Sequence, residues 1–111
     1  MSLRVQRSEW FMGDLEHYAA WYDREAGWNI AERYLKAVAA TLALLAEEPT
    51  LGCGTDFNAL ELRGLRFRQV EKPLHLIFYR YNETTLSAER AVHCARDLPR
   101  RLAQPPGSET D

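Results

Sequence analysis

The sequence is poor in the features that mark secreted and membrane proteins. Cys53 and Cys94 are the only cysteines among 111 residues, and two are too few for a disulfide-stabilised scaffold. No stretch approaches the ~18 consecutive apolar residues that cross a bilayer, and the N-terminus contains no apolar run typical of a signal peptide. We therefore expect a cytoplasmic protein with reduced thiols and no membrane association.

Motifs that bind phosphates or metals are also missing. The sequence contains no glycine-rich phosphate loop, no HExxH and no CxxC. A metal could be bound only by a set such as Cys53, Cys94, His75 and His93. Of these, only His93 and Cys94 are close in sequence, and adjacent residues of a strand point to opposite faces. We expect neither a metal site nor a cofactor.

Charge is distributed unevenly along the chain, although the net charge is only −2. Residues 1–60 carry five basic and nine acidic side chains, whereas residues 61–104 carry nine basic and five acidic ones. This asymmetry is compatible with an anionic ligand on the C-terminal half. It is much weaker than the basicity of a stand-alone nucleic-acid binder, so we expect no direct sequence-specific binding of nucleic acid.

The N-terminal half has the pattern of a strand followed by a helical hairpin. Residues 3–7 alternate as a short strand does, and Ser8 before Glu9 is typical of a helix start, where a hydroxyl accepts from free amides. Gly27 ends this helix and Pro49 closes the next. The apolar stripes are Phe11, Leu15, Tyr18 and Tyr22 on the first helix, and Ile30, Tyr34, Ala37, Val38, Thr41 and Leu45 on the second.

Two groups of side chains lie beside the first stripe. The acidic group is expected on a solvated helix face and consists of Asp14, Glu16, Asp23 and Glu25. Trp10 and Trp21 flank the stripe. They either wedge against the neighbouring helix or sheet, or form an exposed flank that binds a partner.

The segment 74–81, LHLIFYRY, is the most strand-like stretch of the chain. Its apolar face consists of Leu74, Leu76 and Phe78, and its mixed face of His75, Ile77, Tyr79 and Tyr81. Pairing Phe67 with Leu76 and Leu65 with Phe78 joins the apolar sets and places Arg66 and Arg68 on the mixed face. We expect the helices to cover the apolar face and the mixed face to stay open.

The C-terminal part gives weaker signals. Residues 85–93 predict a third strand here, although Arg90 stands in its apolar phase, and residues 96–102 fit a short helix. Residues 104–111 have the composition of a disordered tail. The sequence therefore predicts one α+β domain over residues 1–103, with the order β-α-α-β-β-β and a helical hairpin packed on one face of a small antiparallel sheet.

Four basic side chains form the strongest candidate for a chemical site. Arg66, Arg68 and His75 share the mixed face, and Arg96 follows the last strand. Guanidinium groups bind phosphate and an imidazole can transfer a proton, so this set could act on a phosphodiester. On the residues alone, surface arginines with one histidine filling a sheet face are the simpler interpretation.

Three short segments stand in an order and at separations that are similar to those of a known family. They are Leu62-Arg63-Gly64-Leu65-Arg66, Ile77-Phe78-Tyr79-Arg80 and His93-Cys94-Ala95-Arg96-Asp97-Leu98-Pro99. These resemble the LRxGLR, IFYR and HGARD segments of ParE toxins, which belong to the RelE/ParE superfamily of type II toxin–antitoxin systems. Asp14-Leu15, Gly27 and the spacing from Pro49 to Gly52 also fit, and the resemblance covers residues 3–102.

The resemblance implies a choice between two activities. RelE-like members cut messenger RNA on the ribosome with basic strand residues, which correspond here to Arg66, Arg68, His75 and Arg96. ParE-like members inhibit DNA gyrase. The sequence favours the ParE-like activity, because residues 99–102 lack the tyrosine of RelE, a histidine replaces an arginine, and low basicity disfavours a grip on ribosomal RNA.

The favoured interpretation is a gyrase-inhibiting toxin without enzymatic activity, which stabilises a plasmid or chromosome and is neutralised by a partly disordered antitoxin. The residues expected to contact the target are Arg90, His93, Arg96, Asp97 and Arg100. Trp10 and Trp21 are the candidates for the antitoxin contact. A RelE-like mRNA endoribonuclease and a non-toxic interaction module are the alternatives.

Overall fold

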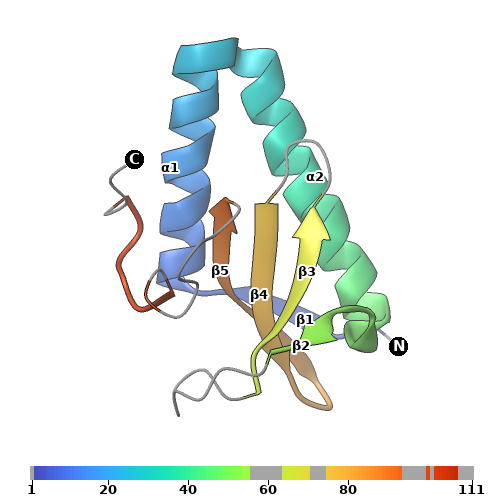
Figure 1. Cartoon of the computed structure of the whole chain (residues 1–111). Coiled ribbons are helices and arrows are strands. Elements are labelled where there is room, and N and C mark those ends of the chain that lie inside the picture. Colours follow the sequence, from blue (N-terminus) through green and yellow to red (C-terminus); the bar gives the residue numbers. More distant parts are fainter. Residues whose placement is uncertain (1, 56–63, 71–74, 94–99, 101, 108–111) are drawn as a thin grey trace.

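The computed structural model describes residues 2–55, 64–70, 75–93, 100 and 102–107. Within these residues two α-helices pack against a five-stranded sheet with the strand order β1-β5-β4-β3-β2 (Figure 1). The predicted α+β class with a helical hairpin on one sheet face is confirmed. No helix in this part of the chain has the length and apolarity needed to cross a bilayer.

The bounds of the elements follow the sequence signals closely. They are β1 (Arg4–Arg7), α1 (Glu9–Ala26), α2 (Trp28–Glu47), the 3-10 turn η1 (Pro49–Leu51), β2 (Cys53–Gly54), β3 (Arg66–Val70), β4 (His75–Tyr81) and β5 (Thr85–His93). The short strand β2 was not predicted. It pairs antiparallel with β3, while β1 pairs in parallel with β5, so the sheet is mixed where the sequence analysis expected it to be antiparallel throughout.

Local chemistry explains where the helices begin and end. The Ser8 hydroxyl accepts from the Phe11 amide at 3.0 Å and caps α1, a contact that typically contributes about 1 kcal/mol. Gly27 separates the helices with a φ of 92°, a conformation that favours glycine. Pro49 follows Glu48, the C-cap residue of α2, and starts η1.

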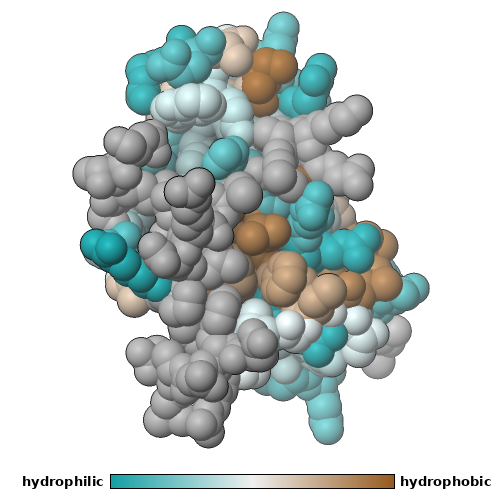
Figure 2. All heavy atoms as spheres, in the orientation of Figure 1, coloured by the Kyte–Doolittle hydropathy of each residue, from teal (hydrophilic) through white to brown (hydrophobic). Residues whose placement is uncertain are grey.

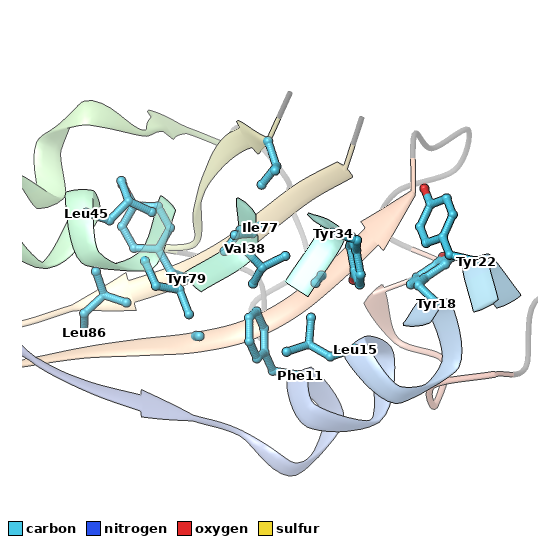
Figure 3. Close-up of a cluster of buried hydrophobic side chains, with 14 of the residues drawn as sticks. Phe11, Leu15, Tyr18, Tyr22, Tyr34, Val38, Leu45, Ile77, Tyr79 and Leu86 are labelled. Carbon is cyan, nitrogen blue, oxygen red and sulfur yellow. The ribbon is translucent and has the colours of Figure 1, made fainter. Parts of the chain in front are cut away.

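The main core lies between the two helices and the sheet (Figure 3). Rings from both helices share this core with the side chains of Ile77 and Tyr79 on β4, and both of these residues are fully buried. A second, smaller cluster lies on the opposite sheet face and consists of Leu65, Phe78, Val92 and Leu102, with Phe67 and Leu76 packed against it.

The helices cover the opposite face of β4 from the one that the sequence analysis expected. The mixed face, with His75, Ile77 and Tyr79, is the one under the helices. Two of its polar atoms find partners there, because the Tyr79 hydroxyl donates to the Pro49 carbonyl at 2.6 Å and His75 Nε2 bonds the Tyr22 hydroxyl at 2.9 Å. Polar atoms that are satisfied in this way allow the large rings to bury their area in the main core.

The predicted register of the β3–β4 hairpin was also wrong, by two residues. Phe67 lies opposite Phe78, and Arg66 opposite Tyr79. A shift of two preserves which side chains share a face, so the apolar set stays together in the smaller cluster. Arg66 and Arg68 consequently share the face that the helices cover.

A bulge in the pairing of β4 with β5 explains the weak pattern of the last strand. Phe78 pairs with Arg90, whereas the next residue, Tyr79, pairs with Ala88. The extra residue, Glu89, reverses the alternation of the strand. Leu86, Ala88 and Ala91 can therefore all contribute to the main core, and Arg90 falls on the face of Phe78.

Part of the expected tail lies against the domain. The Gln104 carbonyl accepts from Arg90, and Gly13 packs on the ring of Pro106. Residues 108–111 lie outside the described residues. Of the short helix predicted over 96–102, Arg100 and Leu102 are helical, and positions 96–99 and 101 lie outside the described residues.

Candidate functional site

Side chains of α1 and of its N-cap residue Ser8 take the place of a strand along the edge of β5. β1 pairs with β5 only as far as Ala88. Beyond that point the Ser8 hydroxyl donates to the Glu89 carbonyl at 2.9 Å, while the Ala91 and His93 amides donate to Asp14 and Tyr18 at 2.9 and 3.2 Å. The spacing of Asp14 and Tyr18 on the helix matches that of Ala91 and His93 on the strand, since four helical residues rise about 6.0 Å and two strand residues about 6.6 Å.

Asp14 and Arg90 form a buried ion pair at this edge. The Arg90 Nε donates to Asp14 Oδ2 at 2.8 Å and its Nη2 donates to Oδ1 at 2.9 Å, while Nη1 donates to the carbonyls of Leu102 and Gln104. The side chains are only 2% and 6% exposed for Asp14 and Arg90. One guanidinium therefore joins α1, β5 and the C-terminal segment.

Two sequence expectations are corrected by this pair. Asp14 was assigned to a solvated helix face and Arg90 to the surface that contacts the target, and both are buried. A signal for the pair was present, because Asp14 stands beside Leu15 within the apolar stripe and Arg90 in the apolar phase of its strand. Two opposite charges that both fall in apolar phases indicate a buried ion pair.

The two arginines of β3 hold the turn η1. Arg66 Nη2 donates to the carbonyls of Thr50 and Gly52 at 3.2 and 2.5 Å, and Arg68 Nη1 donates to the Leu51 carbonyl at 3.2 Å. These cations therefore satisfy carbonyl groups at the end of the helical hairpin. The expectation that they lie on an open sheet face is wrong.

The side chain of Tyr79 on β4 also holds η1, and we call the contacts of Arg66, Arg68 and Tyr79 with this turn the η1 anchor. Its hydroxyl donates to the Pro49 carbonyl and accepts from the Gly52 amide at 3.0 Å. Gly52 leaves no room for a side chain, because a Cβ there would lie 2.1 Å from the Tyr79 hydroxyl. The sequence patterns gave no sign of these contacts, and Thr55 is the last residue after η1 that the structure describes before residue 64.

His75 lies in a buried ring cluster. Its ring centroid is 4.7 Å from that of Tyr18, 4.6 Å from that of Tyr34 and 5.2 Å from that of His93. Burial, with a smaller contribution from the His93 charge, lowers the pKa of His75 to about 3. Burial likewise raises the pKa of Tyr22 and Tyr34. His75 is therefore a neutral core residue at pH 7.

The structure does not bring the proposed phosphodiester residues together. Arg66 lies opposite Tyr79, four residues along β4 from His75, which is a separation of about 13 Å. Arg66 and Arg68 bond backbone carbonyls, and His75 is fully buried. Arg96, the fourth residue of the set, lies outside the described residues.

Other predicted contact residues are exposed. His93 ends β5 at the surface and Arg100 is exposed, while Asp97 lies outside the described residues. Trp10 and Trp21 are 41% and 42% exposed, so they are half-exposed side chains on α1 rather than buried wedges. The Trp10 ring lies 5.1 Å from the Arg90 guanidinium carbon.

The visible surface is mixed in character. Polar and apolar residues are interspersed over the face shown in Figure 2, and apolar atoms gather in the region of β3 and the lower part of α2. In the described part of the chain, no three His, Cys, Asp or Glu side chains are grouped as metal ligands would be.

Comparisons with known proteins agree with this geometry. A search of curated proteins finds no match. A chain in the solved structure of the chromosomal ParDE TA system from P. aeruginosa matches with a TM-score of 0.70 at 14% identity, covering 85% of this chain and 98% of that chain. At this identity the likeness shows the fold alone. The model of the family described as ParE toxin of type II toxin-antitoxin system, parDE, matches residues 5–98. This chain therefore belongs to the ParE toxin family.

Proposed function

We propose that this chain is a cytoplasmic toxin that inhibits DNA gyrase by protein–protein contact and is neutralised by a cognate antitoxin. Membership of the ParE toxin family supports the toxin role. The observation that favours a contact mechanism over RNA cleavage is the engagement of Arg66, Arg68 and His75 within the fold. A neutral, fully buried imidazole cannot exchange protons with a bound substrate at pH 7.

The target surface that we propose lies at the end of β5 and in the segment that follows. His93 and Arg100 are its exposed members, and Arg96 and Asp97 are proposed with them from the sequence. Arg90 acts indirectly, because its guanidinium holds the carbonyls of Leu102 and Gln104. Basic residues of this kind can recognise an acidic surface of a protein target.

Expression of the chain in bacteria tests this proposal against its alternatives. Induction should arrest growth and relax a reporter plasmid while transcripts stay intact, and co-expression of the small gene next to its own should restore growth. Cleaved transcripts that disappear in Arg96→Ala would instead establish the ribonuclease alternative. Full growth with abundant folded protein would establish a non-toxic interaction module.

A matched pair of charge reversals tests the target surface. Arg100→Glu should abolish growth arrest without changing the melting temperature, because the side chain is exposed. Arg33→Glu reverses an equally exposed charge on α2 and should leave toxicity intact. Equal toxicity of both variants would remove Arg100 from the proposed surface.

The antitoxin contact that we propose includes the exposed tryptophans of α1. Tryptophans at interfaces often contribute 2 kcal/mol or more to binding, so Trp21→Ala should weaken antitoxin binding by roughly 30-fold. Trp28→Ala removes a similarly exposed ring at the start of α2 and serves as the control. Unchanged affinity of Trp21→Ala in a calorimetric titration would exclude this contact.

A further inference from the structure

The C-terminal segment crosses from one side of the sheet to α1. We call residues 102–107 the strap. It starts at Leu102, which is buried with Phe78 and Val92 on the sheet face away from the helices. Its Gln104 carbonyl then accepts from Arg90 at 2.6 Å, and Pro106 reaches Gly13 on α1. Figure 1 shows this part of the chain, in red, beside α1.

Gly13 forms a notch for the proline ring. A Cβ at Gly13 would lie 2.8 Å from Pro106 Cγ and 3.0 Å from its Cβ, closer than a packed carbon can come. Glycine inside a helix is destabilising, and α1 has this glycine in its second turn. The missing side chain is what lets the ring of Pro106 lie on the helix backbone.

The notch lies in a stripe along one side of α1. Trp10, Gly13, His17 and Trp21 follow one another at spacings of three and four residues, which places them on one helix face. A Cβ at Gly107, the last residue of the strap, would lie 3.6 Å from His17 Nδ1. The strap therefore occupies the middle of a stripe whose two ends are half-exposed tryptophans.

Most of the strap is accessible to solvent. Apart from Leu102, its described residues are exposed or only partly buried. Its carbonyl bonds go to an arginine that the pair with Asp14 already fixes in place. The two consecutive prolines also restrict the unbound segment and so lower the entropy lost when it docks.

We propose that the stripe Trp10, Gly13, His17 and Trp21 is a docking surface for a proline-containing turn, and that its occupant is the strap of the same chain. A notch beside aromatic side chains is a known way for a surface to receive a proline ring. The strap then controls access to the middle of α1. This proposal is independent of the proposed function, because its test measures docking on the isolated chain.

Two shortened chains test the docking. One ends at Ala103 and lacks most of the strap, and the other ends at Gly107 and keeps it. Backbone NMR spectra should show amide shifts confined to residues 10–21 and Arg90 in the first chain and no such shifts in the second. Identical α1 signals in both chains would overturn the proposal.

A full-length variant protects the test against a failure of the shortened chain to fold. Gly13→Ala favours the helix and removes the notch, so its α1 signals should resemble those of the chain that ends at Ala103. A synthetic peptide of residues 103–111 is the probe for the empty docking surface. A short flexible tether gives an effective concentration in the millimolar range. At that concentration the peptide should shift the α1 signals of the chain ending at Ala103 back toward those of the full chain. Failure to do so, or equal binding to the Gly13→Ala form of that shortened chain, would overturn the proposal.

Discussion

Replacing Arg90 by methionine should be among the most damaging single changes in this protein. The substitution keeps a long side chain but removes the cation, which leaves the carboxylate of Asp14 buried without its opposite charge, although it still accepts from the Ala91 amide. Removing one partner of a buried ion pair typically costs about 3–5 kcal/mol. That loss is a large part of the roughly 5–15 kcal/mol that stabilises a domain of ordinary size.

Denaturant and thermal unfolding would measure the effect. At roughly 4 °C per kcal/mol for a domain near this size, Arg90→Met should melt about 12–20 °C below the unsubstituted chain. Arg80→Met is the matched control, because its ion pair with Glu89 at 3.0 Å is about one-third exposed at both side chains. A pair of that kind contributes less than about 1 kcal/mol.

The double variant Asp14→Leu with Arg90→Met isolates the pair itself. Removing both charges leaves no uncompensated ion, so the double variant should be more stable than the sum of the two single losses by about 2–3 kcal/mol. If Arg90→Met costs no more than Arg80→Met, or if the two single losses simply add, the buried pair does not hold the fold in the way described.

Three further outcomes follow from the η1 anchor and the ring cluster. Gly52→Ala should lower the melting temperature far more than Gly54→Ala. A Cβ at Gly52 would meet the Tyr79 hydroxyl, whereas a Cβ at Gly54 would meet nothing within 4 Å. Equal melting temperatures would contradict this. Tyr79→Phe should cost about 1–3 kcal/mol, since two backbone partners lose their bond, and an unchanged denaturation midpoint would argue against it. The folded pKa of His75 is about 3 and its unfolded value 6.5, so the unfolded chain binds the extra proton and stability falls as pH drops below 6.5. The loss from pH 7 to pH 5 should be about 2 kcal/mol and should vanish in His75→Gln.

Helix boundaries were predictable because they depend on local chemistry. Ser8, Gly27 and Pro49 mark the starts and ends of α1 and α2 through capping, positive φ and ring geometry, none of which needs tertiary contacts. The segment 74–81 contains β4 for a similar reason, since alternation and aromatic content are properties of the strand itself.

The sequence could not show which face of β4 the helices cover, because that choice depends on contacts between residues that are distant in sequence. Both faces carry large apolar side chains, and the choice between them follows from Tyr79 bonding Pro49 and His75 bonding Tyr22. These partners are 30 and 53 residues away in sequence. The bulge at Glu89 was equally hidden, because an inserted residue looks like a faulty alternation until its partner strand is known.

The family could be predicted from short motifs, whereas the candidate site could not. Arg66 and Arg68 match basic positions by strand placement, but their guanidinium groups turn to the carbonyls of η1. A sequence gives the position of an arginine on a strand and leaves open which of its neighbours will accept its hydrogen bonds.

Inhibition of purified DNA gyrase is the most direct measure of the central claim. The purified chain, added to gyrase and a relaxed plasmid, should block supercoiling in proportion to its concentration, and the purified antitoxin should restore it. Arg33→Glu should inhibit as the unsubstituted chain does, and Arg100→Glu should not. Full supercoiling activity in the presence of excess folded toxin would contradict the account.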